Sequence, residues 1–266
     1  MAGSDESGSG GWRKGEFVRW QDLFLPVPAF LVWLGLLALA AAVAIVVGER
    51  FAIPGKKIAS LIGAANKDFA SSQFAAASLE ISLLFFSWRV ARRVAGPSLV
   101  ARYRPIGWNA FLMSLAGGCV LALMLFGVNW EFATHAIVKF HVSAGERLSL
   151  PQSAGQLPLG LLCVGVLAPF CEELYFRGVV LSWLRSKMIA PLAAPASAAF
   201  FALAHLRFVT HPDLDGWVYT GAIAVVGLVN AVLALRTRSL WGPFAVHAGY
   251  NATIIAMVAL SATVKV

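Results

Sequence analysis

The chain has 266 residues, of which 59% are hydrophobic and 13% are charged, and its formal net charge is +8. Soluble domains contain about 25% charged residues, so this composition excludes an ordinary water-soluble protein and predicts a membrane protein. The positive charges stand mostly in short segments between apolar runs, such as residues 89–93 and 102–104. Lysine and arginine at such places set the orientation of a membrane protein, so we expect a lipid bilayer, and no nucleic acid, as the partner.

Apolar runs near the roughly 20 residues that a helix needs to cross a bilayer follow one another along the chain. Before them, residues 1–25 open with a Gly, Ser and acid-rich stretch, which we expect to be a disordered or amphipathic cytoplasmic tail. The expected spans are 26–48, 69–88 and 107–128 in the first half, and 158–184, 194–208, 217–235 and 240–261 in the second. The sequence therefore predicts an all-α, polytopic transmembrane helical bundle of about seven spans, with a range of six to eight.

These runs divide the chain into three parts: the tail at 1–25, the N-terminal transmembrane helices with a polar loop at 26–156, and a four-helix core at 157–266. With about seven spans, the larger share of lysine and arginine falls on the side of the tail, which predicts a cytoplasmic N-terminus for this multi-pass protein. The polar loop contains His135 and His141, which have no partners at ligand spacing, and we expect both to be solvated.

The fourth expected span contains PFCEELYFRG at 169–178, which carries three formal charges. A charge at the centre of a bilayer costs about 2.5 to 3.5 kcal/mol on insertion scales, so these charges need partners. Glu173 and Arg177 are four residues apart and are expected to form an ion pair on one helix face. Glu172 points about 100° away from that pair, and Pro169 should kink the helix and give room for water beside it. Glu172 is therefore the acid that is left to act.

Two later spans carry polar residues at helical spacing. Phe201 and His205 are four residues apart, and so are His247 and Asn251, so the members of each pair share a helix face. At about 1.5 Å per residue from the turns on the shared side, Glu172, His205 and His247 all fall near the middle of a hydrocarbon layer about 30 Å thick. We therefore expect these side chains to meet at one depth.

These residue types suit two kinds of chemistry. A carboxylate and an imidazole can position and deprotonate a water, while a second imidazole and an amide can donate hydrogen bonds to an oxyanion, as acyl hydrolysis requires. Alternatively, Glu172, His205 and His247 could hold a Zn²⁺ ion with an open fourth position for water, although no HExxH motif is present. A site without a cofactor and a zinc site are both open. Glu80, in the second expected span, is a further intramembrane acid, either functional or in contact with a partner helix.

Three elements, EELYFRG at 172–178, FALAH at 201–205 and HAGYN at 247–251, resemble in this order the motifs EExxxR, FxxxH and HxxxN of the CPBP family. This family, also called the Abi or type II CAAX endopeptidase family, consists of intramembrane proteases. The resemblance covers residues 160–255 and implies hydrolysis of a peptide bond within the membrane, in a cavity open to the cytoplasm. The expected substrate is a peptide or a membrane protein.

The resemblance also implies roles for individual residues. Glu172 and His205 would activate the water, and His247 and Asn251 would stabilise the oxyanion. The supporting residues would be Glu173, Arg177 and Phe201. The family has been described both as metal-dependent and as glutamate-dependent, so the zinc alternative stays open. A non-proteolytic membrane scaffold or immunity-type protein of the same fold is the alternative function, and a small transporter or proton relay is a third.

Overall fold

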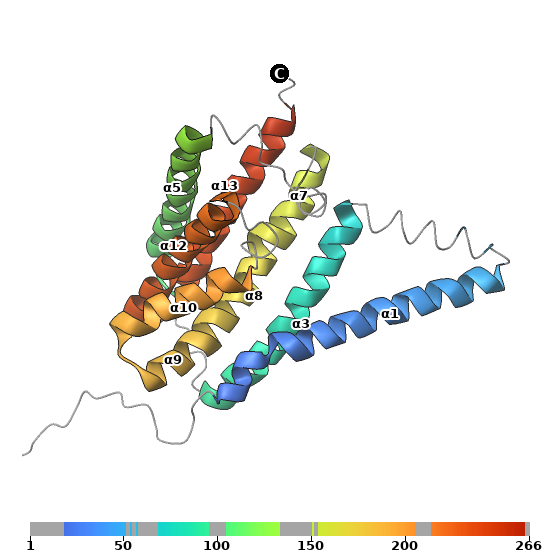
Figure 1. Ribbon diagram of the computed structural model, residues 1–266, viewed down its shortest axis with the longest axis horizontal. Helices are drawn as coiled ribbons and strands as arrows, with labels where there is room; N and C mark the ends of the chain where they lie inside the picture. Colours follow the sequence, from blue (N-terminus) through green and yellow to red (C-terminus); the bar gives the residue numbers. More distant parts are fainter. Residues whose placement is uncertain are drawn as a thin grey trace, which may run out of the picture.

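The computed structural model describes residues 19–51, 54, 57, 69–95, 105–133, 151, 154–205 and 214–263. The secondary structure of these residues is helical, as Figure 1 shows, which confirms the predicted all-α class. The tail at 1–18 and the loop histidines His135 and His141 lie outside the described residues.

The first three expected spans are helices. They are α1 at Pro26–Arg50, α3 at Phe69–Ala95 and α5 at Trp108–Ala133, and a short 3-10 turn, η1 at Trp20–Phe24, precedes α1. Each helix starts within one residue of its predicted position and continues beyond its predicted end. The reason is that helical hydrogen bonding does not stop where hydrophobicity stops, since arginine and other polar side chains at a helix end can reach the interface.

The fourth expected span is a composite helix. It consists of a 3-10 turn, η4 at Ala154–Gln156, followed by α7 at Leu157–Gly160, the π-helix η5 at Leu161–Leu167, α8 at Ala168–Glu173, the π-helix η6 at Leu174–Val180 and α9 at Leu181–Lys187. π-helical turns are rare and occur frequently at functional sites. Here they lie directly before and after α8, the segment that ends in Glu172 and Glu173.

The last three helices are α10 at Ala190–Ala204, α12 at Leu214–Thr237 and α13 at Trp241–Thr263. α10 replaces the expected span at 194–208: it begins and ends earlier, so that His205 follows its last residue. With 15 residues it is about 22 Å long, which is shorter than a hydrocarbon layer of about 30 Å. By length and composition, five helices of the described part are able to cross a membrane, which agrees roughly with the expected span number.

Glycines allow α5 and α13 to pack closely. A Cβ at Gly118 would lie 2.0 Å from the carbonyl oxygen of Val246, and a Cβ at Gly249 would lie 2.2 Å from the carbonyl oxygen of Leu115. Small residues permit this backbone approach between membrane helices. Because α13 contains the HAGYN motif, α5 contributes to the position of that motif.

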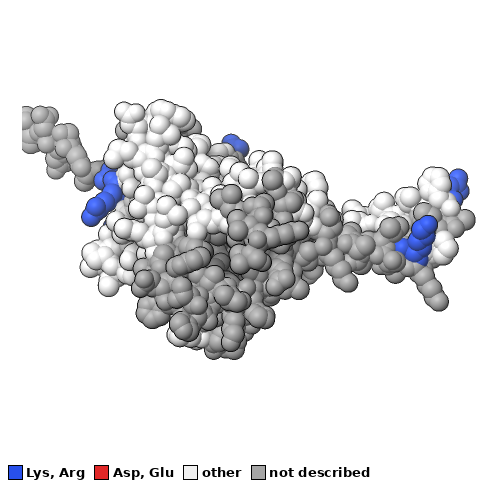
Figure 2. All heavy atoms as spheres, turned by 90° about the horizontal axis from the view of Figure 1, so that it is seen from above, with Lys and Arg blue, Asp and Glu red and all other residues white. Residues whose placement is uncertain are grey.

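The outer surface suits a lipid environment. α1 projects away from the other helices and packs against α3, as Figure 1 shows. Its apolar side chains are exposed, among them Leu31 at 61% and Val46 at 64%. Figure 2 shows a described surface with Lys and Arg at a few separate points and with no acidic side chain visible on that face. Together with the five apolar helices, this surface indicates an integral membrane protein.

Candidate active site

Glu173 and Arg177 form the ion pair that their spacing predicts. Arg177 Nε lies 3.0 Å from Oε2 of Glu173, and the two side chains are 0% and 1% exposed. The guanidinium also donates to the carbonyl oxygen of Gly227 on α12 at 2.9 Å. It lies over the ring of Phe201 on α10, 4.6 Å from the ring centroid. Arg177 therefore neutralises Glu173 and connects three helices.

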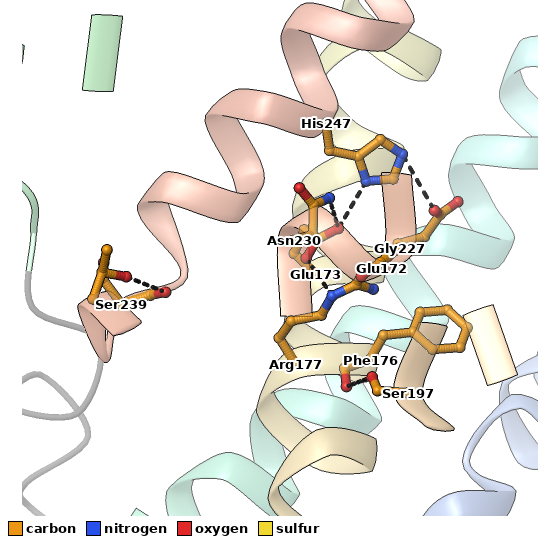
Figure 3. A network of polar contacts seen from close by, with 10 residues as sticks. Glu172, Glu173, Phe176, Arg177, Ser197, Gly227, Asn230, Ser239 and His247 are labelled. Carbon is orange, nitrogen blue, oxygen red and sulfur yellow. Dashed lines mark hydrogen bonds and ion pairs between the residues drawn. The ribbon is translucent and has the colours of Figure 1, made fainter. Parts of the chain in front are cut away.

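Glu173 also accepts hydrogen bonds from two other helices, as Figure 3 shows. Its Oε1 lies 2.9 Å from Nδ1 of His247 on α13 and 2.9 Å from Nδ2 of Asn230 on α12. A carboxylate oxygen can only accept, so Nδ1 of His247 carries a proton. Oε1 of Glu173 thus accepts two hydrogen bonds and Oε2 forms the ion pair with Arg177, so both oxygens are engaged by neighbouring side chains.

Glu172 points away from that pair, as expected from the offset of about 100° between adjacent helical residues. Its Oε2 lies 3.7 Å from Nε2 of His247 and is without a hydrogen-bond partner among the residues that the structure describes. Its side chain is 19% exposed, whereas that of Glu173 is 1% exposed. Glu172 is therefore the more accessible of the two adjacent acids.

Glu80 on α3 is another acid near Glu172. The two carboxyl groups are close enough to interact electrostatically. Within the described ranges, the buried Oε2 of Glu80 has no hydrogen-bond partner. Because α3 packs against α8 and η6, the N-terminal part of the chain brings this acid to the candidate site. Its role stays a prediction.

Phe201 lies between the two motif histidines. Its ring centroid is 4.8 Å from that of His205 and 5.4 Å from that of His247, and its side chain is fully buried. Nδ1 of His205 lies 2.8 Å from the carbonyl oxygen of Phe201. Since a carbonyl oxygen only accepts, this Nδ1 carries a proton, and Nε2 of a neutral His205 has the lone pair of a proton acceptor.

Asn251 bonds to the backbone of the composite helix. Its Nδ2 donates to the carbonyl oxygen of Val164 in η5 at 2.9 Å. In a π-helix, this carbonyl would accept from the residue five positions later, which is Pro169, and proline has no N–H. The side chain of Asn251 therefore supplies the hydrogen bond that Pro169 cannot make.

The expected zinc ligands Glu172, His205 and His247 do not form a metal site as arranged. In the described part of the chain, no group of three or more His, Cys, Asp or Glu side chains lies where it could hold a metal ion. Glu172 and His247 are neighbours, but His205 is connected to His247 through the ring of Phe201.

Two contributions of α12 were missed from the sequence. Asn230 is a fully buried amide within the apolar run 217–235, and this isolation in a span is the signal that could have found it. Gly227 contributes a backbone carbonyl, which no residue type marks in a sequence. A Cβ at Gly227 would lie 3.1 Å from the ring of Phe201 and 3.2 Å from Cα of Ala198, so the glycine also allows α12 to approach α10.

Fold and site together define a class of protein. The described part of the chain is a helical membrane protein that buries Glu, Arg, His and Asn side chains at one place, and ionisable groups within transmembrane helices commonly belong to functional sites. Residues 154–253 match the family model described as Type II CAAX prenyl endopeptidase Rce1-like. This part of the chain is therefore similar to that family, in agreement with the resemblance seen in its three motifs.

The family match contains every motif residue and leaves α1, α3 and α5 outside it. The chain is also 28% identical over 135 residues to an Escherichia coli protein described as an uncharacterized 24.3 kDa protein. That similarity covers 46% of this chain and 59% of the relative, so the chain spans less than two thirds of the relative's length. No solved structure matches the chain.

Proposed function

We propose that the chain is an intramembrane endopeptidase that hydrolyses a peptide bond of a membrane-associated protein or peptide. Glu172 and His205 activate the water, and His247 and Asn251 stabilise the oxyanion. The observation that carries the proposal is the difference between two adjacent acids. Glu173 has both oxygens occupied, whereas Glu172 is partly exposed beside His247. The family match supports the reaction class.

The first step is the activation of water. Oε2 of Glu172 takes a proton from a water molecule, while Nε2 of a neutral His205 accepts the other hydrogen in a hydrogen bond that orients the water. The water oxygen then attacks the carbonyl carbon of the peptide bond, and an electron pair of the C=O bond moves to the carbonyl oxygen. The result is a tetrahedral oxyanion.

His247 transfers the proton that Glu172 took from the water toward the oxyanion. Its Nδ1–H is bound by Glu173, so Nε2 of the neutral ring faces Glu172 across 3.7 Å with a lone pair. Proton transfer from Glu172 to Nε2 produces an imidazolium, whose Nε2–H donates to the negative oxygen. When the intermediate collapses, the C–N bond breaks and the leaving nitrogen takes this proton.

Asn251 can serve both the backbone and the oxyanion. Its amide nitrogen has two N–H groups, of which one is directed to Val164 at 2.9 Å. The second is the donor that we assign to the oxyanion. His247 lies four residues before Asn251 in α13, so the two side chains share a helix face and both donors approach from one side.

Cleavage of a membrane-anchored reporter peptide by the purified chain in liposomes tests this function. Glu172→Gln keeps the size of the side chain and removes the base, and we expect it to lower the rate by about 10² to 10⁴-fold. His205→Ala and His247→Ala should lower it similarly, whereas Leu31→Ala on the exposed face of α1 serves as the control. Cleavage that survives all three site variants would refute the proposal.

The scaffold alternative gives a different result in cells. If the Glu172→Gln protein is present at a normal folded level and keeps full biological function, the chain acts by binding alone. Chelator treatment of the purified chain tests the metal alternative. Stoichiometric bound zinc together with chelator-sensitive cleavage would contradict a mechanism in which Glu172 activates the water without a metal.

A further inference from the structure

α12 carries none of the three motifs, but it contacts the EELYFRG element at two points one helical turn apart. The carbonyl oxygen of Gly227 accepts a hydrogen bond from Arg177, and Nδ2 of Asn230 donates to Oε1 of Glu173, both at 2.9 Å. Both members of the buried ion pair are therefore held by this helix. Gly227 does so through its backbone, and Asn230 does so through its side chain.

Asn230 uses the donor end of its amide. The side chain is 0% exposed, and within the described part of the chain its Oδ1 has no hydrogen-bond partner. An unpaired buried polar atom costs about 1 to 3 kcal/mol, which an apolar residue at this position would avoid. Stability alone thus does not account for an asparagine here. An apolar residue could not supply the contact of Nδ2 with Glu173.

Two donors meet at Oε1 of Glu173, namely Nδ2 of Asn230 and Nδ1 of His247, and Figure 3 shows both side chains directed at this oxygen. The other oxygen is held by Arg177. A carboxylate bound at both oxygens from different helices cannot rotate freely, so Oε1 stays opposite the imidazole of His247. Nε2 of the same ring then stays opposite Glu172.

We infer that Asn230 is a positioning residue, which fixes Oε1 of Glu173 and thereby keeps the ring of His247 in place with its proton on Nδ1. This inference rests on the proposed function of His247 and extends it to α12. Without the amide of Asn230, the carboxylate of Glu173 turns about its side-chain bonds. The ring of His247 is then free to take the other tautomer, in which Nε2 carries the proton and cannot accept one from Glu172.

The test follows the protonated ring nitrogens of His247 by NMR. The full chain is labelled with ¹⁵N-histidine in detergent micelles, and the variant His247→Gln identifies the signals of this residue among five histidines. Asn230→Leu removes the donor at similar size, and Asn230→Asp keeps the shape but replaces the donor by an oxygen. The matched control is Thr220→Val, also in α12, which removes a buried hydroxyl that bonds to Gly216 of its own helix at 2.7 Å.

We expect wild type and Thr220→Val to show His247 with the proton on Nδ1, and the two Asn230 variants to lose this signal in part or whole. With the reporter peptide, kcat should fall on the order of tenfold at an unchanged KM, the effect of one hydrogen bond to a charged group. A wild-type His247 protonated on Nε2 alone overturns the inference, as does an unchanged Nδ1 signal in a folded Asn230 variant.

Unfolding of both Asn230 variants beside a folded Thr220→Val also overturns the inference, because it shows a structural role. The inference and the proposed function fail separately. If the wild type cleaves no peptide but the Asn230 variants lose the Nδ1 signal, the proposed protease function is refuted and the positioning role of Asn230 is supported. If the wild type cleaves the peptide but the Nδ1 signal of His247 is unchanged in the Asn230 variants, the protease function is supported and the positioning role is refuted.

Discussion

Replacing Gly118 by alanine tests whether α5 sets the position of α13. The new Cβ would lie 2.0 Å from the carbonyl oxygen of Val246, 2.8 Å from its carbonyl carbon and 3.0 Å from the backbone nitrogen of Tyr250. All three are backbone atoms, so no side chain can rotate to make room. Since a close carbon–oxygen contact is about 3.3 Å, the helices must separate by about 1.3 Å at this point.

We expect Gly118→Ala to lower the free energy of unfolding by about 1 to 3 kcal/mol, the usual range for overpacking. The displacement also affects the site, because His247 is the neighbour of Val246 in the chain. A shift of about 1 Å at a site residue can lower a rate by about 100-fold, so cleavage of the reporter peptide should fall more than stability alone explains.

Gly117→Ala is the matched control. A Cβ at Gly117 meets nothing within 4 Å, and alanine in a helix is more favourable than glycine by about 0.5 to 1 kcal/mol. Thermal unfolding in detergent and reporter cleavage are measured for both variants. The opposite signs of the two stability changes are the decisive result. If Gly118→Ala is as stable and as active as Gly117→Ala, the reasoning about the close backbone contact is wrong.

Two further predictions concern the buried polar groups. Glu173→Gln leaves Arg177 buried without a counter-charge and should lower the free energy of unfolding by about 3 to 5 kcal/mol; a loss below about 1 kcal/mol in chemical denaturation would contradict a buried pair. Asn251→Ala leaves the carbonyl oxygen of Val164 unpaired and should cost about 1 to 3 kcal/mol. Pro169→Ala restores an N–H and should recover part of that loss, so additive effects in this double-mutant cycle would argue against the explanation of the Asn251 contact.

The family motifs could be found from the sequence because each is a local pattern. Glu173 and Arg177 lie on one helix at a spacing of four, and helix geometry alone brings them to 3.0 Å. The same geometry turns Glu172 away from the pair. The end of α10 could not be predicted from the apolar pattern, because the expected apolar run continues to 208 while the helix stops at Ala204. His205 is thus placed after a helix and not within one.

Composition and apolar spacing by themselves determined that this chain is a helical membrane protein, since a bilayer requires long apolar helices that satisfy their own backbone hydrogen bonds. Only the tertiary structure decided how the polar residues are paired. Asn230, His247 and Asn251 reach partners that are 57, 74 and 87 residues away in the chain. Such contacts depend on which helices pack together and at what rotation. This packing is decided by close approaches such as those at Gly118 and Gly249, which a one-dimensional pattern does not specify.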